Sequence, residues 1–182
     1  MPPPFRPLKL QEFADEFAAF AWSRPVFRVD MHHTWYPAHD DWKGLESIEG
    51  MYFFHTRERG FEDIAQHVSI APDGMIWTGR DWNKIPASIG CNMNAQAFMF
   101  EAIGNFDNGV DRLEGAQLDA VIGLIDVVQR RFKLPVQALL FHREVPQTKK
   151  TCPGTSIDKF DILAAVARRR QTDRTATMRP TG

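Results

Sequence analysis

Apolar residues recur along the chain at helical spacing in some segments and form extended runs in others, and the two kinds of segment alternate. Helical spacing predicts helices over residues 10–22, 118–128 and 155–166, and more weakly over 45–57. Extended apolar runs predict strands over residues 26–33, 97–106 and 136–142. The segment HVSIAPDGMIW, residues 67–77, predicts two strands joined by a Pro-Asp-Gly turn.

The ends of the predicted elements carry local sequence signals. Pro25 separates the first helix from the first strand. Thr155 and Asp158 match a capping box, so we expect the last helix to open there. The arginines at 168–170 suit its C-terminal end because cations stabilise the negative end of the helix dipole.

This order of elements predicts an α/β fold consisting of a single domain with a central mixed β-sheet flanked by helices. The hairpin favours a mixed sheet over an all-parallel one. We divide the chain into an N-terminal segment and helix (1–24), the main domain (25–170) and a disordered tail (171–182). We expect a monomer.

Composition excludes several classes of function. The chain has 182 residues, a net charge of -1, 43% hydrophobic and 25% charged residues, so it lacks the positive field that nucleic acid requires. No apolar run reaches the ~20 residues of a membrane span, so no membrane partner is expected. The opening MPPPFRPLKL leads into Glu12, Asp15 and Glu16, unlike a signal peptide. We therefore expect a cytoplasmic protein, or one released by lysis or specialised secretion.

Histidines end two of the predicted strands, in VDMHH and ALLFH, and the second strand leads into FHREVPQTKKTCPG. Imidazole nitrogens and a thiolate are ligands that zinc favours, and three protein ligands with one open position are typical of a catalytic site. One histidine of the pair, His142 and Cys152 would supply such a set. The alternative is that these histidines are structural residues with satisfied hydrogen bonds.

Four segments in the same order resemble the zinc-dependent N-acetylmuramoyl-L-alanine amidase family, which includes peptidoglycan recognition proteins and phage amidase lysozymes. They are MHHTWYP, RGFEDIAQHVSIAPDGMIWTGRDW, FMFEAIGNFD and FHREVPQTKKTCPG. The resemblance implies an amidase-like fold, a Zn²⁺ cofactor and peptidoglycan or a muropeptide as partner. It also implies hydrolysis of the amide bond between N-acetylmuramic acid and the L-alanine of the stem peptide.

By position, the resemblance implies that His32, His142 and Cys152 are the metal ligands. Period-two alternation along a strand argues against adjacent histidines both being ligands. We therefore expect His33 to face the other side of the strand, where it packs or lines the cleft. We place His33 and Trp35 among the substrate-binding candidates.

Glu101 is the acidic residue within the apolar run FMFEAIG. Apolar surroundings raise the pKa of a carboxyl group towards the range useful for proton transfer. We expect Glu101 to be the catalytic base and acid, a role that glutamate has at this place in the bacterial amidases of the resembling family. The alternative is a carboxylate that pairs with an arginine or lies at an exposed edge.

Lys150 lies two residues before Cys152. The phage branch of the family has a lysine there that supports the oxyanion, so Lys150 is a second catalytic candidate. The alternative is a solvated loop lysine beside Lys149.

The sequence also departs from the family pattern. Ala65, Gln66 and His67 replace a Gly-Tyr-His motif, so no tyrosine can assist the oxyanion from there. Cys91 stands where a histidine is expected, so it is either a small buried residue, which we favour, or part of an altered cleft wall. The aromatic rings of Trp35, Tyr36 and Trp82 would suit a groove for glycan and peptide, although tryptophans more often pack in cores.

Two alternative functions remain open. One is a non-catalytic recognition module that binds peptidoglycan without cutting it. The other is a structural metal domain, which requires a fourth protein ligand. Four residues are candidates for that ligand: His33, His55, His67 and Cys91.

Overall fold

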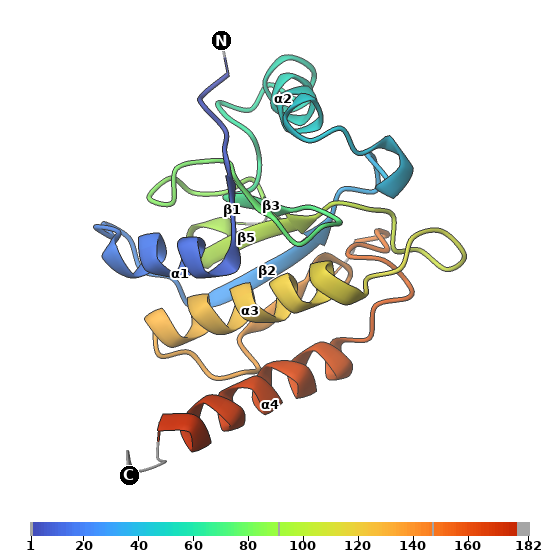
Figure 1. The fold of residues 1–182 in the computed structure, drawn as a ribbon. Helices are drawn as coiled ribbons and strands as arrows, with labels where there is room; N and C mark the ends of the chain where they lie inside the picture. Colours follow the sequence, from blue (N-terminus) through green and yellow to red (C-terminus); the bar gives the residue numbers. More distant parts are fainter. Residues whose placement is uncertain (1, 91, 147, 178–182) are drawn as a thin grey trace.

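The computed structural model describes residues 2–90, 92–146 and 148–177, with side chains through Thr172. Its sheet has the strand order β1-β4-β3-β5-β2-β6 (Figure 1). The strands are β1 (Pro7–Leu8), β2 (Arg28–His33), β3 (Val68–Ile70), β4 (Ile76–Thr78), β5 (Ala97–Ala102) and β6 (Leu139–Phe141). The helices are α1 (Leu10–Ala19), α2 (Leu45–Phe53), α3 (Gly115–Arg131) and α4 (Lys159–Thr177).

The sheet is mixed, as the sequence predicts. Strands β3, β5, β2 and β6 run parallel, whereas β4 runs antiparallel to β3 and β1. The predicted hairpin is confirmed: Ala71 donates its N–H to the carbonyl of Met75 at 2.9 Å, and Gly74 adopts a φ of 83°. No helix among the described residues is long and apolar enough to span a membrane.

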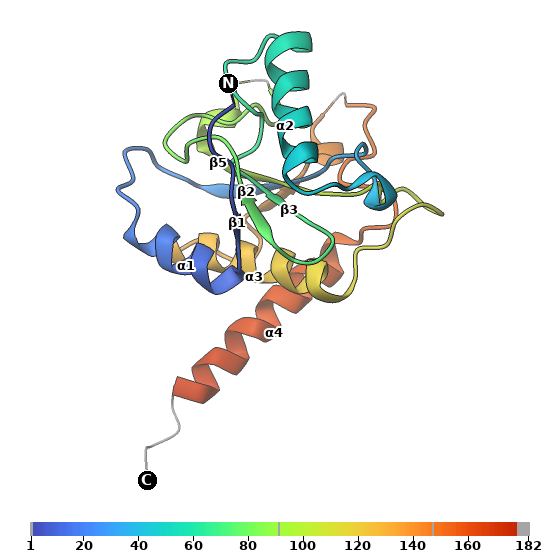
Figure 2. The same ribbon diagram turned by 45° about the horizontal axis from the view of Figure 1, so that its top comes forward.

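The helices flank the sheet on both sides. Helices α1 and α3 lie along one face, α4 packs on the outer side of α3, and α2 lies beyond the other face (Figure 1). Turned by 45°, the molecule shows the far end of α4 extending away from the sheet (Figure 2).

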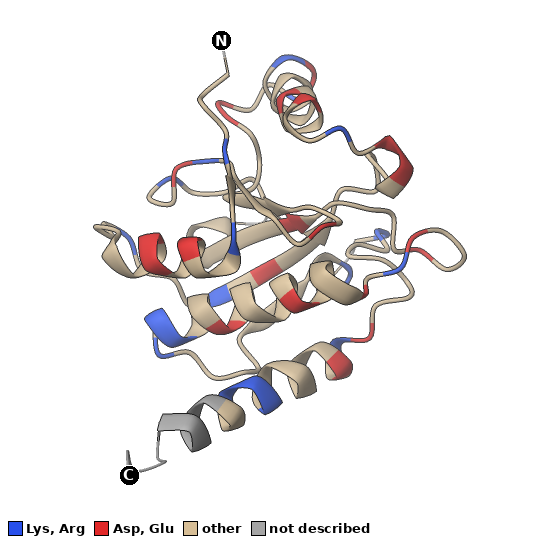
Figure 3. Cartoon of the chain, viewed as in Figure 1, with Lys and Arg blue, Asp and Glu red and all other residues tan. Residues whose placement is uncertain are grey.

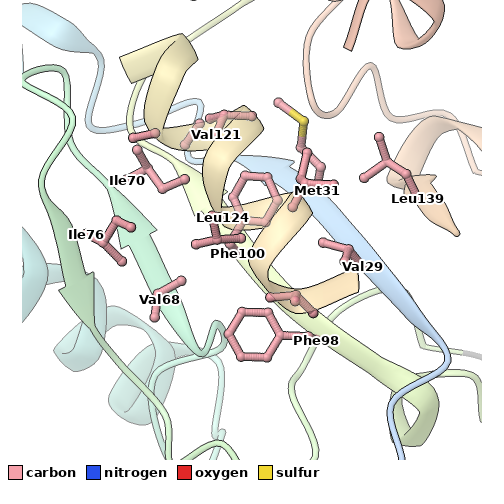
Figure 4. Packing of buried hydrophobic residues seen from close by; sticks show 14 of the residues in the cluster. Val29, Met31, Val68, Ile70, Ile76, Phe98, Phe100, Val121, Leu124 and Leu139 are labelled. Atoms are coloured by element: carbon pink, nitrogen blue, oxygen red, sulfur yellow. The ribbon is translucent and has the colours of Figure 1, made fainter. Parts of the chain in front are cut away.

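Strand alternation divides the residues of β2 and β5 between the two faces. On one face, side chains of the sheet pack against Val121 and Leu124 of α3 (Figure 4). These side chains are Val29, Met31, Phe98 and Phe100, and each is fully buried. A smaller apolar cluster under α2 covers part of the other face and contains Phe5, Ile48, Met51, Ile64 and Ile103. The intervening strand residues, including His32 and Glu101, therefore point to the side that α3 does not cover.

The last helix begins later than the capping-box pattern predicts. Asp158 precedes its first residue, Lys159, and its carboxylate accepts the N–H of Phe160 at 2.7 Å, as an N-cap side chain does. The hydroxyl of Thr155 instead accepts the N–H of Asn108 at 2.8 Å. Our prediction that Thr155 opens the helix was therefore wrong.

Helix α4 also continues to Thr177, past Gln171, where we expected a disordered tail to begin. In Figure 3, the first turn of α4 contains red for an acidic residue, and the arginines at 168–170 appear in blue further along the helix. These arginines lie within the helix because α4 packs on α3, where Arg170 donates to Asp126 at 2.8 Å.

Trp82 belongs to the core. It is 8% exposed and lies against the rings of Phe13, Phe17 and Phe98, so it does not line a groove. Cys91, which we expected to be buried, lies outside the described residues.

Candidate active site

The three predicted metal ligands come together at the carboxyl ends of adjacent parallel strands. His32 lies near the end of β2, His142 directly follows β6, and Cys152 lies in the loop before α4. Their nearest ligand atoms all lie within 4.8 Å of one another. The Nδ1 atom of His32 is 3.4 Å from the Sγ atom of Cys152, and the two imidazole centroids are 4.9 Å apart.

Arg143 couples the positions of His142 and Cys152. It follows His142 in a 3-10 turn, and its N–H donates to the carbonyl of Cys152 at 2.8 Å. Its guanidinium donates to the carbonyls of Gly154 and Ile157. One residue thus ties the Cys152 loop to the end of β6.

Burial disfavours charge on the three candidate ligands. It lowers the pKa of His32 well below the usual value, with further lowering from His142 and Lys150. Burial and Lys150 also lower the pKa of His142, so both imidazoles are neutral and able to bind a cation. Burial raises the pKa of the Cys152 thiol to about 12 in the metal-free protein.

Glu101 lies beside this cluster. It is the register partner of His32 across β2 and β5, and its side chain lines the same cavity as the cluster. No described residue forms a hydrogen bond or ion pair with its carboxyl group, so the alternative in which Glu101 pairs with an arginine finds no support there. Burial raises the pKa of Glu101 to about 8, although Lys150 opposes the shift.

Lys150 differs from Lys149 in its electrostatic effect. Both line the cavity, but the Lys150 ammonium lowers the pKa of Glu101 and of the candidate ligands His32 and His142. The shifts of these three pKa values trace to burial, to Lys150 and, for His32, to the neighbouring histidines. Lys150 itself is exposed.

His33 points away from the three candidate ligands, as alternation predicts. Its Nδ1 atom accepts the N–H of Phe106 at 3.2 Å, and its ring lies 6.2 Å from the Phe106 ring. Burial lowers its pKa to about 4. The residue nevertheless borders the cavity at the strand end.

Two adjoining cavities form a cleft at this edge of the sheet. One, of about 480 Å³, contains the three candidate ligands and Glu101, and the other, of about 640 Å³, extends toward α2. Trp35 borders both and remains 62% exposed. Its φ of 61° is uncommon for a bulky residue, and its N–H donates to the carbonyl of Gly104 at 3.0 Å. Tyr36 borders the second cavity and is 67% exposed.

The position of the missing tyrosine is occupied by a buried glutamine. Gln66 donates through Nε2 to the hydroxyl of Ser69 at 2.8 Å, and its Oε1 atom has no hydrogen-bond partner. Its side chain does not border either cavity.

Two of the other histidines have ring nitrogens that already have hydrogen-bond partners. His55 Nδ1 accepts the N–H of Ala65 at 3.2 Å. His67 Nδ1 accepts the N–H of Met99, and its Nε2 lies 3.0 Å from the Lys84 carbonyl. Among the described residues, no fourth histidine, cysteine or carboxylate joins the three-residue cluster.

Sequence reasoning missed two polar residues behind His32. The ring Nε2 atom of His32 lies 2.8 Å from the hydroxyl of Ser88, which donates to Asp30 at 2.7 Å. Asp30 could have been found, because it lies two residues before His32 and shares its strand face. Ser88 lies in an irregular loop, where no periodicity indicates which residues meet the sheet.

Comparison with known proteins agrees with this arrangement. The family model described as N-acetylmuramoyl-L-alanine amidase matches residues 22–155. Peptidoglycan-recognition protein LB of Drosophila melanogaster is 35% identical over 136 residues, covering 71% of this chain. The chain spans only 55% to 59% of the length of LB and of its relative SC2 from the same fly.

Solved structures include both recognition proteins and amidases. A mutant of Drosophila PGRP-LB in complex with tracheal cytotoxin has a TM-score of 0.63 and 31% identity, covering 76% of this chain and 80% of that chain. The N-acetylmuramoyl-L-alanine amidase LysC from Clostridium intestinale has a TM-score of 0.63 and 25% identity, covering 81% and 93%. The fold and site thus define an amidase or peptidoglycan-recognition-protein domain. This chain belongs to the N-acetylmuramoyl-L-alanine amidase family.

Proposed function

We propose that this protein is a zinc-dependent amidase. It hydrolyses the bond between the lactyl group of N-acetylmuramic acid and the L-alanine of the stem peptide. The observation that carries the proposal is the position of Glu101, a carboxyl group with no partner among the described residues, in the same cavity as His32, His142 and Cys152. A metal site and a proton-transfer group in one cleft are the parts that amide hydrolysis needs.

The donor set fits zinc. Two imidazole nitrogens and one sulfur lie close enough to converge on one ion after small side-chain shifts, and three protein ligands leave a fourth position for water or substrate. The buried thiol of Cys152 also needs a nearby cation to ionise. Bound zinc would polarise the scissile carbonyl and lower the pKa of a water molecule to ~7.

Glu101 moves the protons. Its carboxylate accepts a proton from the attacking water, and the resulting carboxylic acid donates it to the departing amine of L-alanine. Burial raises the pKa of Glu101 to about 8 in the metal-free protein, which brings the carboxyl group toward the range that proton transfer near neutral pH requires.

Lys150 stabilises the negative charge that develops on the carbonyl oxygen. Its ammonium acts electrostatically on Glu101 and on the candidate ligands His32, His142 and Cys152. Since a tyrosine is missing at Gln66, this ammonium supplies more of the oxyanion stabilisation than it would beside a phenol.

Trp35 binds substrate over the cavity that holds Glu101. Its ring is exposed and its backbone is fixed by the hydrogen bond to Gly104, so it offers an ordered apolar face to a sugar or peptide. His33 supports the floor of the same cleft while its Nδ1 atom stays bonded to Phe106.

A recognition module is the second candidate function, and the burial of Gln66 away from the cleft favours it. Such a protein would retain the cleft and bind muropeptides without hydrolysing them. The two functions differ in turnover and not in affinity for the wall.

The test is incubation of purified peptidoglycan and of a soluble muramoyl-peptide with the protein, followed by mass spectrometry. The amidase releases peptides with free L-alanine amino termini and leaves intact lactyl-bearing glycan. A chelator should abolish this release, and added zinc should restore it. Binding of wall material without any release would instead establish the recognition module.

A further inference from the structure

A chain of buried polar contacts lies behind the candidate metal ligand His32. Its Nε2 atom is 2.8 Å from the Ser88 hydroxyl, and that hydroxyl donates to Asp30 Oδ2 at 2.7 Å. The Asp30 side chain is fully buried and pairs with Arg28 at 2.7 Å. Ser88 also borders the cavity that holds the candidate ligands, whereas Asp30 lies behind it.

The contacts fix the direction of each hydrogen bond. Both oxygens of the Asp30 carboxylate accept from Arg28, and Oδ2 also accepts the single hydrogen of the Ser88 hydroxyl. Ser88 can then only accept from His32, whose Nε2 must carry the hydrogen. The lone pair of His32 is left on Nδ1, the atom that lies 3.4 Å from Cys152 Sγ.

Arg28 contacts both Asp30 and the loop that carries Ser88. Besides pairing with Asp30, its guanidinium donates to the Met93 carbonyl at 2.7 Å, in the loop that carries Ser88. Asn94 accepts the N–H groups of Ile89 and Gly90 at 2.9 Å each. The segment that follows Ser88 is thus tied to β2 through Met93 and braced internally by Asn94.

We propose that Ser88 and Asp30 are positioning residues for the metal site. They hold His32 in the Nε2–H tautomer and direct Nδ1 toward the ion. This inference rests on the proposed function. Ligating histidines commonly donate their other N–H to such a partner, and the partner orients the ring and raises its basicity. His142 has no such partner among the described residues, so the orientation of His32 organises the site before the metal binds.

The test compares zinc affinity by chelator competition in the parent protein, Ser88→Ala and Ser88→Thr. Ser69→Ala is the matched control, because Ser69 is also buried and accepts a side-chain hydrogen bond, from Gln66. We expect Ser88→Ala to bind zinc about 10- to 100-fold more weakly. Ser88→Thr, which keeps the hydroxyl, and Ser69→Ala should stay close to the parent affinity.

A second measurement reads the tautomer directly. Nitrogen-15 NMR of the metal-free parent protein should show His32 protonated at Nε2, and Ser88→Ala should lose this preference. Parent-like zinc affinity in Ser88→Ala, or a proton on Nδ1 in the parent, would overturn the positioning role and leave the proposed function standing. A parent protein that binds no zinc would overturn the proposed function itself.

Discussion

His32 and Glu101 are register partners on the neighbouring parallel strands β2 and β5, and both side chains line one cavity. The strand pairing therefore fixes a candidate metal ligand beside a candidate proton-transfer group. Neither side chain depends on a flexible loop for its position, which is the arrangement that preorganised catalysis requires.

Replacing Glu101 by glutamine separates metal binding from chemistry. Glu101→Gln keeps the size of the side chain but cannot accept a proton, so we expect zinc content to be unchanged and turnover to fall by about 10²- to 10⁴-fold. Elemental analysis and the muropeptide assay measure the two effects. Glu62→Gln, at an exposed position, is the control and should behave like the parent. Near-normal turnover in Glu101→Gln would show that the catalytic assignment is wrong.

Removing the thiol should remove the metal. Cys152→Ala leaves only His32 and His142, and two ligands bind zinc too weakly to survive purification, so we expect zinc content and turnover to be lost together. The other cysteine of the chain provides the control, since Cys91→Ala should retain zinc. Loss of zinc from both variants would instead favour a structural site closed by a fourth ligand.

The adjacent lysines should differ in their effect on rate. Lys150→Met removes the cation that acts on Glu101, and we expect turnover to fall by about 10²-fold or more as oxyanion stabilisation is lost. Lys149→Met removes an equal charge from the same cavity and should retain most of the activity. Equal losses in kcat for the two variants would indicate that only the general positive charge of the loop matters.

The raised pKa of Glu101 predicts a pH-dependent stability in the metal-free protein. Its folded-state pKa of about 8 exceeds the usual value of 4.5, so the folded state binds more protons between these values and stability falls as pH rises. The difference in unfolding free energy between Glu101→Gln and the parent isolates this effect. As pH rises from 5 to 8, we expect Glu101→Gln to gain stability relative to the parent by up to about 1.4 kcal/mol per pH unit. Urea denaturation of both proteins across this pH range measures the difference. A constant difference across this range would contradict the pKa shift.

Gly154 is expected to control the shape of the Cys152 loop. Its φ of 118° disfavours any side chain, and an added Cβ atom would collide with the backbone of Phe106. Gly154→Ala should cost about 1–3 kcal/mol of stability and weaken zinc binding. Gly109→Ala is the control, because Gly109 also has a positive φ but open space around it. Denaturation and chelator titration distinguish the two variants, and equal effects would mean that backbone strain alone is responsible.

Periodic features of the fold were predictable from the sequence. Alternation over residues 26–33 placed His32 and His33 on opposite faces, and the Pro-Asp-Gly turn located the hairpin. These predictions succeeded because a strand or turn follows from its own local residues.

Features that depend on tertiary contacts were not predictable in this way. Thr155 matched a capping box, but its hydroxyl is used by Asn108, a residue 47 positions earlier in the chain. Trp82 entered the core because α1 supplies Phe13 and Phe17 to pack against it. Ser88 met His32 through a loop with no periodic pattern.

The most direct test of the central claim is hydrolysis of a soluble N-acetylmuramoyl-peptide in water enriched in oxygen-18, followed by mass spectrometry of both products. We expect one heavy oxygen in the lactyl carboxylate of the sugar, an unlabelled peptide with a free L-alanine amino terminus, and loss of the reaction on chelation. An intact substrate in the presence of zinc, or a label within the peptide, would contradict it.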